Sequence, residues 1–218
     1  MIAPARISLL ALICAIPLLT EAAQQAEPPA AVIEEFQNTL LSVMKNAKRL
    51  GYQSRYDRLA PAVRASHDLA AIAEISVGPY WDQFSQAQRN KLVNAFTKLS
   101  IATYASRFDG YSGQTFEIQS SEEASPHVAS VSSIFRQPEG DDIHFDYLLR
   151  RSQGQWRIVN IVVDGVSDLA LKRADYIGVL RTGGFNALMT KLKKQIADYT
   201  PETRASNDHT KASALFHP

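Results

Sequence analysis

The sequence predicts an α+β fold, because three blocks of hydrophobic periodicity follow one another along the chain. Apolar residues recur at helical spacing up to Phe108, at alternate positions from Thr115 to Asp164, and at helical spacing again up to Tyr199. Turn-forming segments divide the middle block into four runs, which predicts a meander of four antiparallel strands. We therefore expect one domain in which helices wrap a single sheet.

The first 23 residues have the pattern of a secretory signal peptide. One early positive charge, Arg6, precedes an apolar run at residues 7–19, and small residues follow at Ala22 and Ala23. The run is shorter than the about 20 apolar residues that cross a membrane comfortably. An uncleaved anchor is the alternative, because Glu21 weakens the cleavage signal.

The predicted organisation is a signal peptide at 1–23, a folded domain at 24–200 and a disordered polar tail at 201–218. Cys14 is the only cysteine and lies in the predicted signal peptide, so the remaining chain forms no disulfide and relies on its core. The formal net charge is +1, which gives the chain no electrostatic reason to bind nucleic acid.

The N-terminal block predicts several helices. Residues 31–51 place apolar side chains on one face and end at Gly51. The following segment, residues 54–67, predicts short helical pieces interrupted by Pro61.

Two further helices carry recognisable caps. One is expected between Asp68, as its N-cap, and Gly78, as its end. The other begins at Ser85, which forms a capping box with Gln88, and its apolar stripe extends to Phe108.

The four predicted strands are "TFEIQS", "HVASVSSIFRQ", "DIHFDYLLRR" and "QWRIVNIVVD", separated by "SEEASP", "PEGD" and "SQG". In the third strand, Phe145 and Tyr147 share an apolar face, while His144 and Asp146 take the polar face. The fourth strand is apolar on both faces. Two interpretations stay open: a second layer covers the other face, or the sheet borders a cavity.

Two helices are predicted after the sheet, at 166–181 and 185–199, with "RTGGF" as the turn between them. Ser167 lies between strand and helix, as a nucleophile would. A nucleophile elbow requires G-x-S-x-G on a parallel sheet, but Leu169 replaces the second glycine and the sheet is a meander. We therefore predict that Ser167 caps the helix, where Asp168 adds a favourable negative charge.

No motif in the chain predicts catalysis or a metal centre. The histidines lack H-E-x-x-H spacing, and the only candidate metal pair, His144 with Asp146, is better interpreted as a solvated polar face. Lys191–Lys194, "KLKK", is interpreted as the exposed face of a helix, with weak attraction to anionic lipid as the alternative. We expect no cofactor.

Four segments resemble the MlaC-like, toluene-tolerance family of periplasmic lipid carriers. They are "RYDRLAPAV", the long block from "DLAAIAEISVG" to "GQTFEI", "WRIVNIVVDGVS" and "LRTGGFNALMTKLKKQ", and they follow the order of the family. The resemblance implies a curved sheet and surrounding helices that enclose an apolar lipid pocket, without catalysis. It also implies a periplasmic monomer that shuttles lipid between an inner-membrane transporter and an outer-membrane lipid-transfer complex, which maintains outer-membrane lipid asymmetry.

The segment "GVSDLALKRADY" resembles the branch associated with hopanoid biosynthesis, which is HpnM-like. Phospholipid-carrying members more often follow G-V-S with Leu and then Asn-Tyr-Arg, where this chain has Asp168, Leu171 and Lys172. The resemblance to this branch implies a polycyclic triterpenoid as cargo in place of a phospholipid.

The expected pocket residues come from the long helix, the sheet and the returning helix, and each is also a candidate for plain core. They are Phe96, Leu99, Tyr104, Phe108, Phe116, Ile118, Phe145, Tyr147, Val159, Ile161, Val163, Val166, Tyr176 and Leu180.

Two functions of other classes stay open from the residues alone. A small periplasmic hydrolase or isomerase would use the same pocket, with Asp164, His144 or Tyr147 as acid and base. A purely structural envelope protein would contain no internal cavity.

Overall fold

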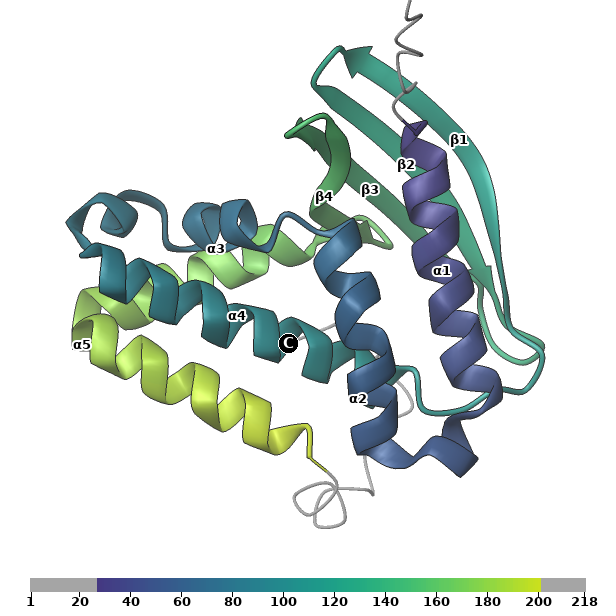
Figure 1. The fold of residues 1–218 in the computed structure, drawn as a ribbon, viewed down its shortest axis with the longest axis horizontal. Helices are drawn as coiled ribbons and strands as arrows, with labels where there is room; N and C mark the ends of the chain where they lie inside the picture. The colour runs from purple at the N-terminus through teal and green to yellow at the C-terminus, as the bar shows by residue number, and fades with distance from the viewer. Residues whose placement is uncertain (1–26, 201–218) are drawn as a thin grey trace, which may run out of the picture.

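The computed structural model describes residues 27–200, which form the expected α+β fold (Figure 1). The predicted signal peptide and C-terminal tail lie outside the described residues. The helices are α1 (Pro29–Lys45), α2 (Ala47–Ser66), α3 (Leu69–Val77), the short 3-10 helix η1 (Gly78–Gln83), α4 (Gln86–Arg107) and α5 (Asp168–Asp198). The strands are β1 (Thr115–Ser125), β2 (Val128–Arg136), β3 (Ile143–Ser152), β4 (Gln155–Val163) and β5 (Val166–Ser167).

The sheet is open and antiparallel, with its strands in the order β1-β2-β3-β4-β5. The long β1–β2 hairpin curves around α1, which packs against β1, β2 and β4 (Figure 1). The other helices gather beside β4, where α4 packs between α2 and α5. In the part of the chain that the structure describes, no helix is both long enough and apolar enough to span a membrane.

The sheet has five strands where the sequence predicted four. β5 has two residues and pairs with the end of β4 across a turn at Asp164 and Gly165. Both turn residues have positive φ, 48° and 83°, as a two-residue type I′ hairpin requires. The sequence could not reveal β5, because two residues are too few to establish a period.

β1 is longer than predicted. It continues through Glu122 and Glu123 to Ser125, in the segment expected to be a turn, and the chain reverses only afterwards. Register shifts near both ends of this stretch keep it paired with β2. Pairing with β2 therefore outweighed the turn-forming composition of this segment, because local propensity does not take a pairing partner into account.

A β-bulge explains why β4 is apolar on both faces. Leu149 pairs with Ile158, whereas the neighbouring Leu148 pairs with Asn160, so Val159 is an extra residue without a partner. One extra residue reverses the alternation, and the apolar residues before and after the bulge lie on the same inner face. These residues are Trp156, Ile158, Ile161 and Val163.

The predicted helix caps are confirmed. Asp68 Oδ1 accepts a hydrogen bond from the backbone N–H of Ala71 at 3.0 Å. Ser85 and Gln88 make both bonds of the capping box. The sequence predicted these ends because every group involved lies within four residues of its partner.

The expected interruption at Pro61 is wrong. α2 continues through Pro61, and the backbone breaks ten residues earlier, at Gly51, where φ is 65° and ψ is 175°. A proline removes one helical hydrogen bond, but Leu59 and Val63 on either side are fully buried and hold the helix against the core. Likewise, α5 bends at Gly184, with φ at 65°, in the predicted "RTGGF" turn, and begins at Asp168, two residues later than expected.

Candidate functional site

A cavity of about 480 Å³ lies between the inner face of the sheet and the helices, with walls contributed by α1, α4, β3, β4 and α5. Pockets of about 300–1,000 Å³ commonly bury one small ligand. Its aromatic wall residues are Phe36, Phe96, Tyr104, Phe108, Phe116, Phe145, Tyr147, Tyr176 and Tyr199. The rings of Phe145 and Tyr147 stack along β3, with centroids 5.9 Å apart. The cavity therefore offers a mainly apolar surface to which aromatic rings contribute.

All but two of the residues expected around a pocket line this cavity. Those on its wall are Phe96, Leu99, Tyr104, Phe108, Phe116, Phe145, Tyr147, Val159, Ile161, Val163, Val166 and Tyr176. The exceptions are Ile118, which packs against the core from β1, and Leu180, which is buried in the core of α5. Both lie on the apolar face that periodicity predicted, but the packing of other elements fills the space beside them. That the wall residues bind lipid stays a prediction.

The cavity wall also contains residues that were not predicted from the sequence to line a pocket. Phe36 and Leu40 of α1 line the cavity, and both lie on the apolar face predicted for the first helix. His67, which follows α2, and Asn160 of β4 also line it. No sequence pattern marks these two polar residues, because their neighbours come from distant parts of the chain.

A closed polar cluster lies beside Tyr147 on the cavity wall. Gln37 Nε2 donates to Ser133 Oγ at 2.8 Å and to Tyr147 Oη at 3.2 Å. Ser133 also hydrogen-bonds Tyr147. Burial raises the pKa of Tyr147 to about 12, so the phenol is neutral.

His67 and Tyr104 form a second polar pair on the wall. His67 Nε2 lies 3.0 Å from Tyr104 Oη, and Nδ1 lies 2.8 Å from Ser66 Oγ. The ring of Phe36 packs edge-on against both rings, with centroids 5.1 Å away. Burial lowers the pKa of His67 to about 4 and raises the pKa of Tyr104 well above 10, so both side chains are neutral.

His67 is expected to destabilise the fold as the pH falls. Its pKa is about 4 in the folded chain and about 6.5 in the unfolded chain, because burial outweighs the opposing effects of the Val63 carbonyl and the Asp168 charge. Between these values only the unfolded chain binds the proton, so stability is complete above pH 6.5 and declines toward pH 4. The loss approaches about 3 kcal/mol, at about 1.4 kcal/mol for each tenfold change in proton affinity.

Urea unfolding at pH about 7.5 and about 4.5 measures this loss. The matched variant is His67→Gln, which keeps a polar side chain but cannot titrate in this range. Carboxyl groups titrate alike in both proteins, so the difference between their pH dependences belongs to His67. Equal pH dependence in the two proteins would contradict the prediction.

Charged residues line the part of the wall contributed by the first half of α5 and its neighbours. Lys172 forms an ion pair with Asp168, and Lys191 pairs with Asp175 at 2.6 Å. All four side chains are partly exposed, so these pairs add little stability. They give the cavity a polar border where it meets solvent.

Ser167 caps α5, as predicted. Its Oγ accepts from the backbone N–H of Ala170 at 3.1 Å and donates its proton to Asn160 Oδ1 at 3.0 Å. No histidine within the described residues reaches the hydroxyl, so nothing there activates it as a nucleophile.

Replacing Ser167 by Ala should therefore lower the free energy of unfolding by about 1 kcal/mol and leave ligand uptake unchanged. Thermal unfolding with a ligand-uptake assay measures both, and Ser167→Thr, which can still cap, is the control. Loss of an enzymatic activity in the Ala variant would contradict the capping role.

The acid–base residues considered for an enzyme do not lie together on the cavity wall, which includes Tyr147 but neither His144 nor Asp164. His144 is exposed on the outer face of β3, whereas Tyr147 is buried on the inner face. Asp164 accepts a hydrogen bond from the backbone N–H of His144 at 2.9 Å, which fixes the β4–β5 turn. These contacts give Asp164 a structural role.

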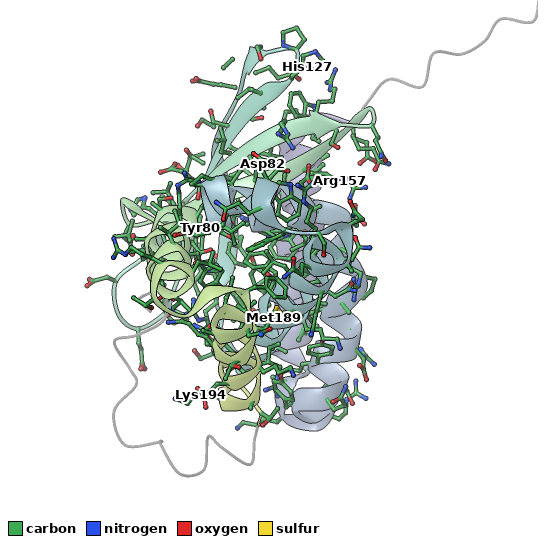
Figure 2. All side chains as sticks on the ribbon, turned by 90° about the vertical axis from the view of Figure 1, so that its left-hand side faces the viewer. Tyr80, Asp82, His127, Arg157, Met189 and Lys194 are labelled. Atoms are coloured by element: carbon green, nitrogen blue, oxygen red, sulfur yellow. The ribbon has the colours of Figure 1, made fainter. Side chains whose placement is uncertain are left out.

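The histidines lie far apart as well. His127 is at the tip of the β1–β2 hairpin, away from the helices (Figure 2), whereas His67 is buried beside the cavity. Among residues 27–200, no three His, Cys, Asp or Glu side chains are grouped to hold a metal ion. In "KLKK", Lys193 and Lys194 are exposed, as expected for the outer face of a helix, whereas Leu192 is buried and Lys191 is half-buried on the cavity wall.

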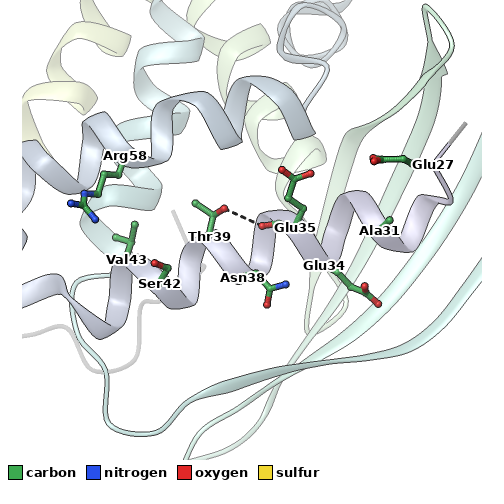
Figure 3. A pocket seen from close by; sticks show the side chains of 9 residues that line it. All are labelled: Glu27, Ala31, Glu34, Glu35, Asn38, Thr39, Ser42, Val43 and Arg58. Atoms are coloured by element: carbon green, nitrogen blue, oxygen red, sulfur yellow. Dashed lines mark hydrogen bonds between the residues drawn. The ribbon is translucent and has the colours of Figure 1, made fainter. Parts of the chain in front are cut away.

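A polar surface depression along α1 is unrelated to the cavity. Glu27, Glu34, Glu35 and Arg58 line it, with short polar residues between them. Figure 3 shows Glu34 and Glu35 projecting to different sides of the helix. These adjacent carboxylates therefore do not form an acid–base pair.

The fold places an apolar cavity with a polar border between a curved sheet and a helical layer, an arrangement that suits the class of proteins that bind an apolar or amphipathic small molecule. A family model described as "MlaC protein" matches residues 34–194. This match covers most of the chain, and the chain belongs to the MlaC family.

Two known proteins are similar to this chain. The intermembrane phospholipid transport system binding protein MlaC of Haemophilus influenzae is 26% identical over 122 residues, which cover 54% of this chain and 57% of the relative. The chain therefore spans little more than half of that relative's length. A phospholipid-binding protein from Ralstonia solanacearum, solved in complex with a phospholipid, has a TM-score of 0.71 and 20% identity, and the match covers 79% of this chain and 99% of that one. At this identity the likeness supports the fold.

Proposed function

We propose that this chain is a periplasmic lipid carrier that shuttles a membrane lipid between the inner and outer membranes. The observation that carries the proposal is the apolar cavity of about 480 Å³ with a charged border, in a chain of the MlaC family. The phospholipid transport and binding named for the two relatives add support. Residues 1–23 would direct export, residues 24–200 would hold the lipid, and transporter complexes in the two membranes would be the docking partners.

A carrier is needed because water opposes the release of a lipid. Each buried methylene contributes about 0.8 kcal/mol, so a chain of ~16 carbons entering water would cost about 12 kcal/mol. An apolar cavity offsets most of this cost, and transfer then requires docking and a small opening over the cavity. None of these steps requires the protein to make or break a covalent bond.

We further propose a hopanoid as the preferred cargo. Leu171 and Lys172, which distinguish "GVSDLALKRADY" from phospholipid-carrying relatives, both line the cavity in the first turns of α5. Lys172 is held toward Asp168, which keeps its charge at the border. A rigid ring system suits a single broad cavity, whereas two flexible tails suit a deeper or forked one.

Native mass spectrometry of protein purified from membranes tests the carrier function, and a co-purifying lipid is the expected result. Protein that is always lipid-free and that also fails to take up added lipid would refute it. Offering delipidated protein equal amounts of a hopanoid and phosphatidylglycerol tests the cargo. A clear preference for phosphatidylglycerol would leave a general phospholipid carrier.

A further inference from the structure

The hydrogen-bond chain through Ser66, His67 and Tyr104 has a direction that chemistry fixes. Ser66 Oγ lies 2.7 Å from the carbonyl oxygen of Ala62. A carbonyl oxygen can only accept, so the single hydroxyl proton of Ser66 is donated there. Ser66 Oγ therefore accepts from the Nδ1–H of His67, 2.8 Å away.

The tautomer of His67 then determines what Tyr104 can do. Neutral imidazole carries one proton, and with that proton on Nδ1 the Nε2 atom is an acceptor. Tyr104 Oη lies 3.0 Å from Nε2, so the phenol donates its proton to His67. The Tyr104 oxygen keeps its lone pairs, and no residue among 27–200 donates a hydrogen bond to them.

Tyr147 and Tyr104 differ in the number of hydrogen-bond partners that their phenol oxygens have. Tyr147 Oη is engaged by Gln37 and Ser133 in the closed cluster. Tyr104 lines the cavity and remains partly accessible, and among residues 27–200 its hydroxyl hydrogen-bonds only His67. Around Tyr104 the wall has aromatic rings, with Phe36 at 5.1 Å and Phe108 at 6.0 Å between ring centroids, and polar side chains that include Thr103 and Arg107. A hydrogen bond from a ligand to the Tyr104 oxygen would be stronger than the same bond in water, because the site is partly buried.

We propose that the Tyr104 oxygen accepts a hydrogen bond from a hydroxyl group carried on the apolar part of the lipid cargo. This inference rests on the proposed carrier function and narrows the cargo to lipids with such a hydroxyl. A ketone oxygen at the same place would meet a second acceptor and remain unsatisfied. The site therefore discriminates by the direction of the hydrogen bond as well as by shape.

Binding of matched fatty acids to delipidated protein tests the proposal. The probes are stearic acid, a positional set of monohydroxylated stearic acids, and keto counterparts with the oxygen on the same carbon, each displacing a fluorescent fatty acid. At least one hydroxy isomer should bind about three- to tenfold more tightly than stearic acid, as one neutral hydrogen bond allows. Its keto counterpart should bind no better than stearic acid.

Three variants assign the preference to the proposed atoms. In Tyr104→Phe the ratio of hydroxy to unsubstituted affinity should fall to about one, because a single hydrogen bond is removed. In Tyr147→Phe the ratio should persist, whatever happens to affinity as a whole. In His67→Phe the Tyr104 proton loses its acceptor and can be donated to a ligand. The affinity for the keto acid should therefore rise relative to the affinity for the hydroxy acid.

The outcomes separate this inference from the carrier function. Equal binding of the hydroxy, keto and unsubstituted acids to the wild-type protein overturns the hydroxyl site and leaves the carrier intact. Persistence of the preference in Tyr104→Phe also overturns it. Failure of every acid to bind overturns the hydroxyl site as well, and the carrier function falls with it only if the delipidated protein also takes up no added membrane lipid. The wild-type comparison decides the matter even if a variant does not fold.

Discussion

Replacing Val163 by Trp is expected to lower lipid uptake at least tenfold while the fold survives. Val163 lies on the inner face of β4, pairs with Phe145 and lines the cavity. The indole would extend into the open space of the cavity and take volume from the ligand. A tenfold loss corresponds to about 1.4 kcal/mol of binding free energy, which a few displaced methylenes would account for.

Val162→Trp is the matched control. Val162 is the neighbouring residue on the same strand, pairs with Asp146 on the opposite face and does not line the cavity. The same substitution there should leave lipid uptake unchanged. Circular dichroism and a lipid-uptake titration on both variants give the comparison. If Val163→Trp unfolds the protein and its soluble fraction binds lipid normally, Val163 belongs to the core and the prediction fails.

Replacing Phe36 by Ala is expected to lower the free energy of unfolding by about 3–5 kcal/mol. Phe36 is 2% exposed and packs edge-on against both His67 and Tyr104. Removing the ring takes away that packing and joins its volume to the cavity. It also admits water to His67, so the low pKa of that histidine should move back toward 6.5.

Phe84→Ala separates the local from the general effect. Phe84 is also buried, and its ring contacts Phe185 with centroids 4.9 Å apart, outside the cavity wall. Phe84→Ala should lower the free energy of unfolding but leave the pKa of His67 unchanged. Urea unfolding gives the stabilities, and histidine NMR titration gives the pKa. An unchanged His67 pKa in Phe36→Ala would show that Phe36 does not seal this site.

The helix caps and the order of helices and strands could be predicted because their causes are local. Asp68, Ser85 and Ser167 each accept a hydrogen bond from the backbone N–H three residues ahead. The inner face of β3 follows from a period of two that no distant contact interrupts. Most of the predicted pocket residues lie on the cavity wall for the same reason: an apolar stripe shows which residues turn inward.

The remaining features depended on partners that the local sequence does not contain. The bulge at Val159 arises from the pairing of β4 with β3, and it turned two apparent apolar faces into one. Continuation of α2 through Pro61 depends on packing against the core, which outweighs the lost hydrogen bond.

Local sequence was enough to specify the α+β class, the helix caps and the inward-facing stripes, because these depend on hydrogen bonds and periodicity within a few residues. Packing between distant elements sets which parts of those stripes border the cavity, and it places Ile118 and Leu180 away from the cavity. It also decided the state of His67, which depends on Tyr104, 37 residues away, and on burial by Phe36. Packing and burial combine groups from distant segments, so no local pattern can specify them.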